Sequence, residues 1–385
     1  MTRTSTTALL VSLLFAAVCS LLSCKGQNGR SAHAGGDTLQ LRHAQHLTIV
    51  RHAGYTTVDL ADPWNEGKTL HTYVLVPRTA PDGSDNPLPT DLPKGTVVRT
   101  PLQHSVIATS AHCRLLQDFG RLTCIAGICD LPYMHLPAVQ QRCREGRIAD
   151  CGSSMSPALE TVLDLQPDAI FLSPFQNSGG YGRLEKLDIP IIETADYMET
   201  SPLGRAEWMR YYGILFGAEH VADSLFAAVE TEYCRLKELA LRSAHRPNVL
   251  MDKQMSSVWY VPGGHSTVGR LIADANLRYP WAADTHSGSL ALAFESVFEQ
   301  AADADLWLLR YNAPSPLTLR SLASEHQGYS RLPVWQKGNV YGCNSYGNTF
   351  HEDTPFRPDL LLRDFITIGH PDLQLGAPHY FVRIE

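Results

Sequence analysis

One stretch of the chain, residues 148–174, strongly limits the folds that are open to it. Its sequence, IADCGSSMSPALETVLDLQPDAIFLSP, holds a Gly/Ser loop, a short helix and a strand in direct succession. Ser156 is placed to cap the helix, and Pro157 to occupy its first turn, where a missing N–H costs nothing. The run Ala169–Leu172 has no polar alternation, which is typical of a strand buried on both faces of a parallel sheet. The stretch therefore predicts an α/β fold.

The same order of residues recurs later in the chain. Residues 293–304, AFESVFEQAADA, match residues 158–169, ALETVLDLQPDA, with Ala, Glu, Val, Asp and Ala in the same places. Each copy leads into an apolar run, and the second run is Leu306–Leu309. A repeat this short suggests two related α/β halves, a hypothesis to be tested against the rest of the chain.

Strands and helices alternate before and after one long helical segment. Apolar runs at Ser105–Thr109 and Cys124–Cys129 are separated by helical residues, a pattern that favours a parallel, doubly wound sheet. Residues 218–243 contain neither Pro nor Gly and predict a rod of roughly 39 Å, which follows a joint at Phe216-Gly217. Two strand-like segments within residues 47–76, separated by a polar turn, predict a β-hairpin.

We therefore predict an α/β fold in which two doubly wound lobes are joined by a long rigid helix, with an extra N-terminal β-hairpin. The 385 residues are more than one ordinary core supports, which agrees with two lobes. The predicted segments are a signal peptide at 1–23, a flexible tether at 24–45, a β extension at 46–100, lobe one at 101–200, a helical connector at 201–245 and lobe two at 246–385.

The N-terminus has the features of a targeting segment. Arg3 precedes an apolar region, Ala8–Leu22, which is shorter than a typical membrane span and is characteristic of a signal peptide. The region ends in Leu21-Leu22-Ser23-Cys24, which resembles a bacterial lipobox. This resemblance predicts lipidation of Cys24 and a location in the cell envelope, anchored to the membrane and facing the periplasm. An ordinary signal peptide with an incidental cysteine is the alternative.

Composition argues against several kinds of partner and site. The net charge of −7, without a basic run, gives no basis for nucleic-acid binding. Seven cysteines follow Cys24, and none has the CxxC spacing of a zinc site, so we predict no metal centre. Loop spacing favours Cys143 and Cys151 as a disulfide pair, and buried free thiols account for most of the others.

The two α/β halves, the lipobox and the long helix resemble the substrate-binding proteins of ABC importers for ferric siderophores, haem and cobalamin. The segment GSSMSPALETVLDLQPDAIFLS resembles the first-lobe element of that family, and LEKLDIPII resembles the element that follows, with Asp188 in place of the usual Gly. FESVFEQAADADLWLL resembles the second-lobe counterpart, with Ala302 in place of a common Pro. The resemblance covers residues 101–372 and leaves out the N-terminal hairpin.

The resemblance implies a binding protein and not an enzyme. Such a lipid-anchored component captures an iron complex (a ferric siderophore or haem) or cobalamin between its lobes and delivers it to an ABC permease and its ATPase. The protein is expected to be a monomer without an intrinsic cofactor. The family docks to its permease through one carboxylate on each lobe, for which Glu185 and Glu325 are candidates; solvated surface carboxylates are the alternative interpretation.

Residues on turns after strands face the cleft in folds of this kind, and they supply the candidate ligand contacts. Aromatic faces stack on macrocycles or catecholates, His and Met are axial ligands of haem iron, and Arg neutralises an anionic chelate. The candidates are His112, Tyr133, Met155, Tyr181, Trp259, Tyr260, His265, Trp281, Arg310 and Tyr346. On this interpretation, Trp259→Ala weakens ligand binding far more than it lowers stability.

Two other classes of function remain open at this point. A chelatase-like enzyme acting on a tetrapyrrole also uses two α/β lobes with His and Glu in the cleft. The chain has no GxSxG, HExxH, P-loop or GxGxxG motif, which counts against the common enzyme classes that use them. A lipid-anchored adhesin or scaffold is the third class, and it would need no cleft of ligand size.

Overall fold

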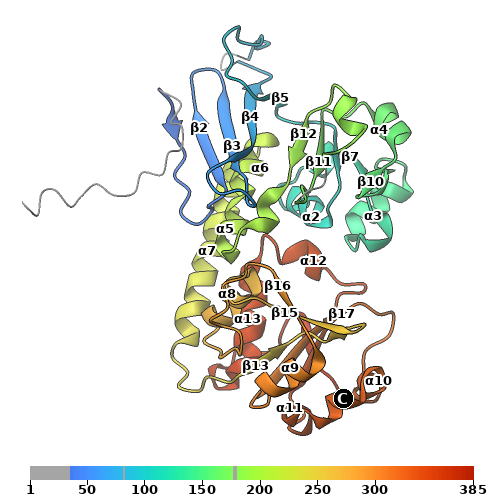
Figure 1. The fold of residues 1–385 in the computed structure, drawn as a ribbon. Coiled ribbons are helices and arrows are strands. Elements are labelled where there is room, and N and C mark those ends of the chain that lie inside the picture. The colour runs from blue at the N-terminus through green and yellow to red at the C-terminus, as the bar shows by residue number, and fades with distance from the viewer. Residues whose placement is uncertain (1–34, 81–82, 177–179) are drawn as a thin grey trace, which may run out of the picture.

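The computed structural model describes residues 35–80, 83–176 and 180–385, and it has the predicted architecture (Figure 1). Two α/β lobes lie one above the other, and a long helix runs along one side of both. An additional β-sheet lies beside the upper lobe. The predicted fold class is confirmed, with an N-terminal part larger than a hairpin. The predicted signal peptide and Cys24 lie outside the described residues.

Lobe one is built on a parallel five-stranded sheet in the order β12-β11-β6-β7-β8. The chain passes from β6 to its neighbour on one side and later returns to the other side, so the strand order reverses between β6 and β11. Open α/β sheets bind ligands at the carboxyl ends of the strands beside such a switch point. The strands are β6 (Ser105–Ile107), β7 (Ile125–Ile128), β8 (Ala149–Asp150), β11 (Ala169–Leu172) and β12 (Ile191–Glu193). The helices are α2 (Ser110–Asp118), α3 (Pro137–Arg144) and α4 (Leu159–Leu165), with short 3-10 turns η1 (Leu122–Cys124), η2 (Leu131–Tyr133), η3 (Leu184–Lys186) and η4 (Ala195–Met198).

The stretch that predicted this lobe differs from the prediction in one detail. All four residues of β11 are buried, as a central parallel strand requires. The helix α4, however, starts after Ala158 and has no side-chain cap. Ser156–Pro157 form a short strand, β10, that pairs antiparallel with β9 (Gly152–Ser153). The predicted cap at Ser156 was therefore wrong, because the residue belongs to this small hairpin.

The connector consists of three helices with the predicted joint. These are α5 (Pro202–Glu207), α6 (Met209–Leu215) and α7 (Glu219–Ala240). Gly217 lies between the last two with φ +60°, a left-handed conformation that glycine adopts without steric cost. The 22 residues of α7 give a rod of about 33 Å, slightly shorter than predicted. Figure 1 shows this helix passing from the upper lobe to the lower one.

Lobe two is built on a smaller, mixed sheet, in the order β13-β17-β18-β19. The first three strands are parallel and the last is antiparallel. The helix α9 precedes β17 as α4 precedes β11, so the short repeat in the sequence marks equivalent elements. The strands are β13 (Val249–Met251), β17 (Leu306–Tyr311), β18 (Val340–Asn344) and β19 (Phe381–Arg383), with a separate sheet of β14 (Gln254–Met255), β15 (Val258–Pro262) and β16 (Ser289–Leu292). The helices are α8 (Thr267–Asp274), α9 (Phe294–Gln300), α10 (Leu319–Glu325), α11 (Pro333–Gln336), α12 (Phe350–Asp353) and α13 (Pro358–Gly369), with η5 (Gln327–Arg331) and η6 (Pro371–Leu373).

The N-terminal part is a five-stranded sheet in the order β1-β2-β3-β4-β5. The predicted hairpin was incomplete, because its first arm is itself two strands that turn at residues 52–55. The last strand pairs parallel to its neighbour, and the others are antiparallel. The strands are β1 (Asp37–Thr38), β2 (Leu47–Arg51), β3 (Thr56–Ala61), β4 (Thr69–Pro77) and β5 (Thr96–Thr100).

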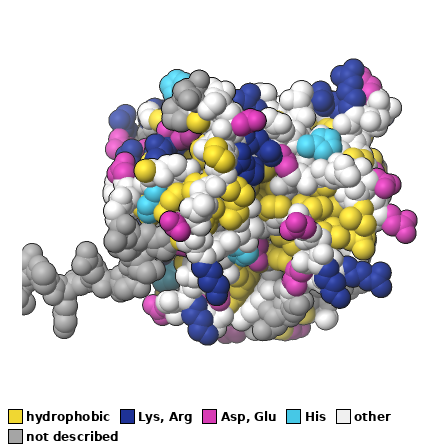
Figure 2. All heavy atoms as spheres, turned by 90° about the horizontal axis from the view of Figure 1, so that it is seen from above, with side chains coloured by type: hydrophobic (Ala, Val, Ile, Leu, Met, Phe, Trp, Pro, Cys, Tyr) yellow, Lys and Arg dark blue, Asp and Glu magenta, His cyan; other side chains and the backbone are white. Residues whose placement is uncertain are grey.

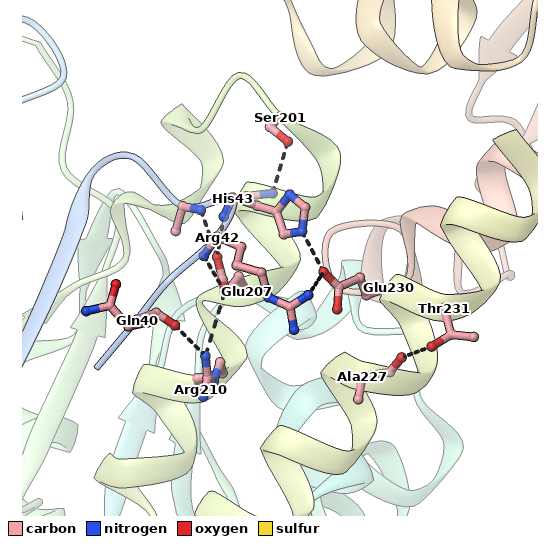
Figure 3. Close-up of polar contacts among 11 residues, drawn as sticks. Gln40, Arg42, His43, Ser201, Glu207, Arg210, Ala227, Glu230 and Thr231 are labelled. Atoms are coloured by element: carbon pink, nitrogen blue, oxygen red, sulfur yellow. Dashed lines mark hydrogen bonds and ion pairs between the residues drawn. The ribbon is translucent and has the colours of Figure 1, made fainter. Parts of the chain in front are cut away.

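The segment before β2 is bound to the connector, although a flexible tether was predicted as far as residue 45. The backbone N–H groups of residues 42–44 donate to the buried carboxylate of Glu207, at 3.0, 2.8 and 2.9 Å. Those of residues 45–46 donate to the carboxylate of Glu199. Figure 3 shows the segment lying across α5, with Glu207 directed at its backbone. We call this set of contacts the N-terminal clamp. Charge-assisted hydrogen bonds of this kind are stronger than neutral ones.

Cysteines and surface add two further observations. All seven cysteines of the described residues are free thiols, so the predicted Cys143–Cys151 disulfide is absent, and four of the seven are buried.

Within residues 35–80, 83–176 and 180–385, no helix has both the length and the hydrophobicity needed to cross a membrane. Figure 2 shows hydrophobic side chains gathered on the upper face, mainly over the side of lobe one, with charged side chains among them.

Candidate functional site

A cavity of about 340 Å³ lies between the two lobes. Lobe one contributes Thr109 and Ser110, which directly follow β6 at the switch point. The connector contributes Arg205, and lobe two contributes Arg310 and His351. The cavity thus lies at the carboxyl edge of the sheet in lobe one, where ligand sites form in open α/β folds. We call it the cleft cavity.

Five helices begin at residues that line this cavity, and three of them, α2, α8 and α13, have eight or more residues. Its lining includes Ser110 at the start of α2, Thr267 at the start of α8 and Pro358 at the start of α13. The cap of α8 is formed by Ser266, whose hydroxyl accepts the backbone N–H of residue 269 at 3.0 Å. A helix N-terminus carries unsatisfied N–H groups and a partial positive charge, so each start favours a negative ligand.

Two arginines on the lining are held from behind by carboxylates. Arg205 Nε lies 3.0 Å from Asp196 Oδ2, and Arg310 Nε and Nη2 lie 2.8 and 2.5 Å from the two oxygens of Asp252. Burial raises the pKa of Asp196, but His112 and Arg205 outweigh this and lower it to about 2, so the group is ionised. Because a guanidinium has five N–H donors, each arginine keeps donors beyond those on its carboxylate. None of the residues that line this cavity is Asp or Glu.

The short helix α12 lies on the side of lobe two that faces lobe one (Figure 1), and its residues Phe350 and His351 line the cleft cavity. The backbone N–H of His135 donates to Glu352 Oε1 at 3.0 Å, and Arg114 Nη1 lies 3.2 Å from Asp353 Oδ1. Burial raises the pKa of Glu352. Burial, together with Arg310 and His135, lowers the pKa of His351, which leaves its imidazole neutral at pH 7. The lobes are therefore in contact across the cleft in this structure.

Three of the predicted ligand contacts are interior residues, and these predictions were wrong. Trp259 is 0 % exposed, and its indole N–H donates to the carbonyl of Met251 at 3.0 Å. His112 is buried, with Nε2 at 3.1 Å from Asp196 Oδ1. Trp281 is also buried, against Tyr279. Large side chains on turns after strands were assigned to the cleft, but here they fill the core.

Five of the predicted contacts are exposed, and four of these have large hydrophobic side chains. Tyr260, the neighbour of Trp259, is 46 % exposed because successive side chains of a strand point to opposite faces. Tyr133 is exposed on lobe one. The Tyr346 ring of lobe two lies 6.4 Å from the ring of His135 in lobe one, so it reaches toward the opposite lobe. Met155, also exposed, lines a second cavity.

The second cavity, of about 750 Å³, lies within lobe one beyond the end of β11. Met155 and Tyr181 both line it, with Ser173 directly after that strand. Since β6 and β11 are paired neighbours, Ser173 and Thr109 follow adjacent strand ends. Two predicted contacts are thus brought together on lobe one near the switch point.

The remaining predicted residues fall in different places. Arg310 lines the cleft cavity, as expected of a ligand contact. His265 is exposed but lines a separate cavity with Arg270 and Arg278, so its assignment to the cleft was wrong. Of the predicted docking carboxylates, Glu185 is exposed and accepts the backbone N–H of residue 181, and Glu325 is paired with Lys253. Docking through these two groups stays a prediction.

Several residues of the cleft cavity were missed. Arg205 was assigned to the connector only, and Thr109 and Ser110 were treated as parts of a strand and a turn. His351 belongs to the run HEDTP, which is rich in charged and metal-binding residue types. Its place on the wall of the cleft cavity, however, depends on how α12 packs against lobe one. A signal in the sequence could have identified three of the lining residues. Thr109, Ser110 and Thr267 are hydroxyl residues at or next to a helix start.

A comparison with known families identifies this architecture. A sequence profile of the periplasmic binding protein family matches residues 106–346, well over half of the chain. The chain belongs to the periplasmic binding protein family. The N-terminal sheet and residues 42–46 precede the matched residues, so this periplasmic binding protein has an N-terminal part outside the matched range, and the clamp binds it to Glu199 and Glu207 within that range.

Relatives and solved structures agree with the assignment. A protein named an uncharacterized lipoprotein in Methanocaldococcus jannaschii is 25% identical over 298 residues, which cover 74% of this chain and 70% of the relative. A periplasmic heme binding protein from Pseudomonas aeruginosa superposes with TM-score 0.57 at 15% identity, covering 74% of this chain and 98% of that one. A molybdate periplasmic binding protein from Haemophilus influenzae, bound to molybdate, gives TM-score 0.55 at 15% identity, covering 71% and 87%. At such identities the two structures show the fold alone.

Proposed function

We propose that this protein is the lipid-anchored substrate-binding component of an ABC importer. Its cleft captures an anionic iron complex, a ferric siderophore or haem, and delivers it to a permease with its ATPase. The family assignment supports the class of protein, and the relative named a lipoprotein supports an anchor at Cys24. The solved relatives named for heme and molybdate support a negatively charged ligand.

The observation that carries the proposal is the charge of the cleft cavity. The starts of three helices of eight or more residues and two arginines converge on it, and neither Asp nor Glu is among its lining residues. Haem brings two propionates and ferric siderophores bring anionic oxygen donors, which suit forked guanidinium hydrogen bonds. Cobalamin has no net negative charge and would make the least use of these groups. The volume of about 340 Å³ is at the small end for ligand pockets, so a large ligand requires the lobes to separate.

Titration of the purified protein tests the proposal. Its absorption spectrum, as isolated from its own source, is recorded first, and haem, a ferric siderophore and cobalamin are then titrated in turn. We expect one of the anionic iron complexes to bind and cobalamin to bind more weakly. Arg310→Lys keeps the charge beside Asp252 but loses the fork, and we expect about tenfold weaker binding, the loss of one charge-assisted hydrogen bond. Arg270→Lys, on the exposed surface of lobe two, is the matched control.

Two results would refute the proposal. Tight binding of cobalamin that is indifferent to Arg310→Lys would show that the cleft does not select a negative ligand. Turnover of a tetrapyrrole together with a metal ion, without stable binding of any complex, would make the protein a chelatase-like enzyme instead.

A further inference from the structure

A third cavity, of about 480 Å³, lies between the N-terminal sheet and the edge of lobe one. The sheet contributes His71 and Thr96, and lobe one contributes Tyr181, Glu193 and the segment 187–190 that leads into β12. None of these residues lines the cleft cavity. The sheet half of its wall precedes the residues that match the family profile, so this cavity is a feature of the N-terminal addition. We call it the sheet cavity.

The sheet cavity is acidic. Its lining includes Glu185, Asp188 and Glu193, and it includes neither Lys nor Arg. Glu193 is the deepest of the three, at 9 % exposed. Its Oε1 accepts the Tyr181 hydroxyl at 3.2 Å, whereas its Oε2 is buried without a hydrogen-bond partner. A buried carboxylate oxygen that lacks a partner is costly, which is a reason to look for a ligand there.

The nearest basic group does not supply the missing partner. His71 Nδ1 lies 3.6 Å from Glu193 Oε2, beyond hydrogen-bond distance, while His71 Nε2 is 2.8 Å from the Thr96 hydroxyl. Burial lowers the pKa of His71, so its ring is neutral at pH 7. Burial raises the pKa of Glu193 to about 7, although the hydrogen bond from the Tyr181 hydroxyl lowers it. The carboxyl group of Glu193 therefore titrates near neutral pH, and neither Lys nor Arg lines the cavity to neutralise its ionised form.

The other walls are hydrocarbon. Val97, Leu187, Ile189 and Pro190 line the same cavity, so an occupant has both a charged end and an apolar body. We propose that the sheet cavity binds a small aliphatic ammonium ion, with Glu193 as its counter-ion. The ammonium group donates to Oε2 of Glu193, and its alkyl chain lies along these apolar side chains. Among the described residues, no group of three His, Cys, Asp or Glu side chains is arranged to hold a metal ion, which favours an organic cation.

The experiment uses n-butylamine as the probe and n-butanol as its neutral counterpart, each titrated into the purified protein by calorimetry or methyl NMR. We expect butylamine to bind at least about tenfold more tightly, because only the ammonium pairs with the carboxylate. Nα-acetyl-lysine methylamide carries the same butylammonium on a peptide backbone. If this compound binds, the site also accepts the lysine side chain of a partner. If it does not bind, the site accepts free amines only. Either result agrees with a site for an ammonium group.

Two further arms connect the binding to Glu193. Glu193→Gln, which keeps the shape, is expected to abolish the preference for amine over alcohol, and Glu238→Gln on the exposed face of α7 is expected to leave it unchanged. Binding should weaken about tenfold or more from pH 8 to pH 5.5, because the carboxyl protonates below its pKa while the amine stays charged. The titratable groups that face Glu193 are Asp62, His71 and Tyr73 of the N-terminal sheet, Tyr181 and Glu185 of lobe one, and Tyr211 of the connector.

The wild-type titration decides the matter even if the variant does not fold. Equal affinity for butylamine and butanol, or no butylamine binding at millimolar concentration, would overturn the proposal. An unchanged preference in a folded Glu193→Gln variant would also do so. Because the sheet cavity and the cleft cavity share no lining residue, these outcomes are independent of the ligand bound between the lobes.

Discussion

Replacement of Trp259 tests whether the residue belongs to the core or to the ligand site. Its indole is fully buried, within 5.6–5.9 Å, centroid to centroid, of the rings of Phe294, Trp307 and Tyr329, and its N–H bonds the Met251 carbonyl. Large-to-alanine replacement of such a residue costs about 3–5 kcal/mol, and the stranded carbonyl adds about 1 kcal/mol or more. Trp259→Ala should therefore lower the free energy of unfolding by about 5 kcal/mol, a large part of the stability of an ordinary domain.

The adjacent residue provides the control for this experiment. Tyr260 lies on the opposite face of the same strand, and Tyr260→Ala should cost about 0.5 kcal/mol or less. Trp259→Phe keeps most of the ring packing and gives an intermediate loss, so the comparison survives if Trp259→Ala does not fold. Urea unfolding with linear extrapolation gives all three values. If Tyr260→Ala were as destabilising as Trp259→Ala, or if Trp259→Ala cost below about 1 kcal/mol, the assignment of inner and outer faces would be wrong.

Two further predictions concern buried carboxylates of the connector region. Glu207→Gln replaces one acceptor oxygen of the N-terminal clamp by an N–H₂ group, which then faces the backbone N–H donors. We expect the amides of residues 42–44 to lose protection from hydrogen exchange by tenfold or more. Unchanged protection would show that the clamp does not hold the segment. Asp196 has a folded pKa of about 2, below its ordinary value of 3.8, so its stabilisation is present above about pH 4 and is lost as the pH falls toward 2. In Asp196→Asn this part of the acid sensitivity should disappear, which urea titrations near pH 5 and pH 2.5 measure; an equally steep loss in the variant would assign the effect to other groups.

The framework of the fold was predictable because it depends on local patterns. A run such as Ala169–Leu172 is apolar at every position, and only a strand covered on both faces accommodates that. The connector was predictable because 218–243 lack helix breakers. The extent of the N-terminal sheet was harder to predict, because the first arm of the predicted hairpin is two strands joined by a turn at residues 52–55. Gly54 in that turn is by itself a weak signal for a chain reversal. The clamp on Glu207 joins residues far apart in sequence and leaves no local pattern.

The ligand contacts were less predictable, for a physical reason. Which of Trp259 and Tyr260 faces the core depends on the pairing of β15 with the distant β16, and a shift of one residue would exchange them. His112 was expected on a turn after a strand, but it lies in the first turn of α2, and a partner 84 positions away, Asp196, holds it inside. Arg310 lies near the carboxyl end of the central strand β17 and lines the cleft cavity, and its contact with a ligand stays a prediction.

The N-terminal clamp determines where a force on the start of the chain would act. A pull on the residues before Asp37 first meets β1, which pairs with β2 in the N-terminal sheet, and then residues 42–46, which the carboxylates of Glu207 and Glu199 hold. The backbone carbonyl of Glu199 also accepts the hydroxyl of Thr267 from α8, so the same point touches lobe two. With the anchor that we propose, the attachment to the membrane would act on the N-terminal sheet and on a region that contacts both lobes, and not on one lobe alone.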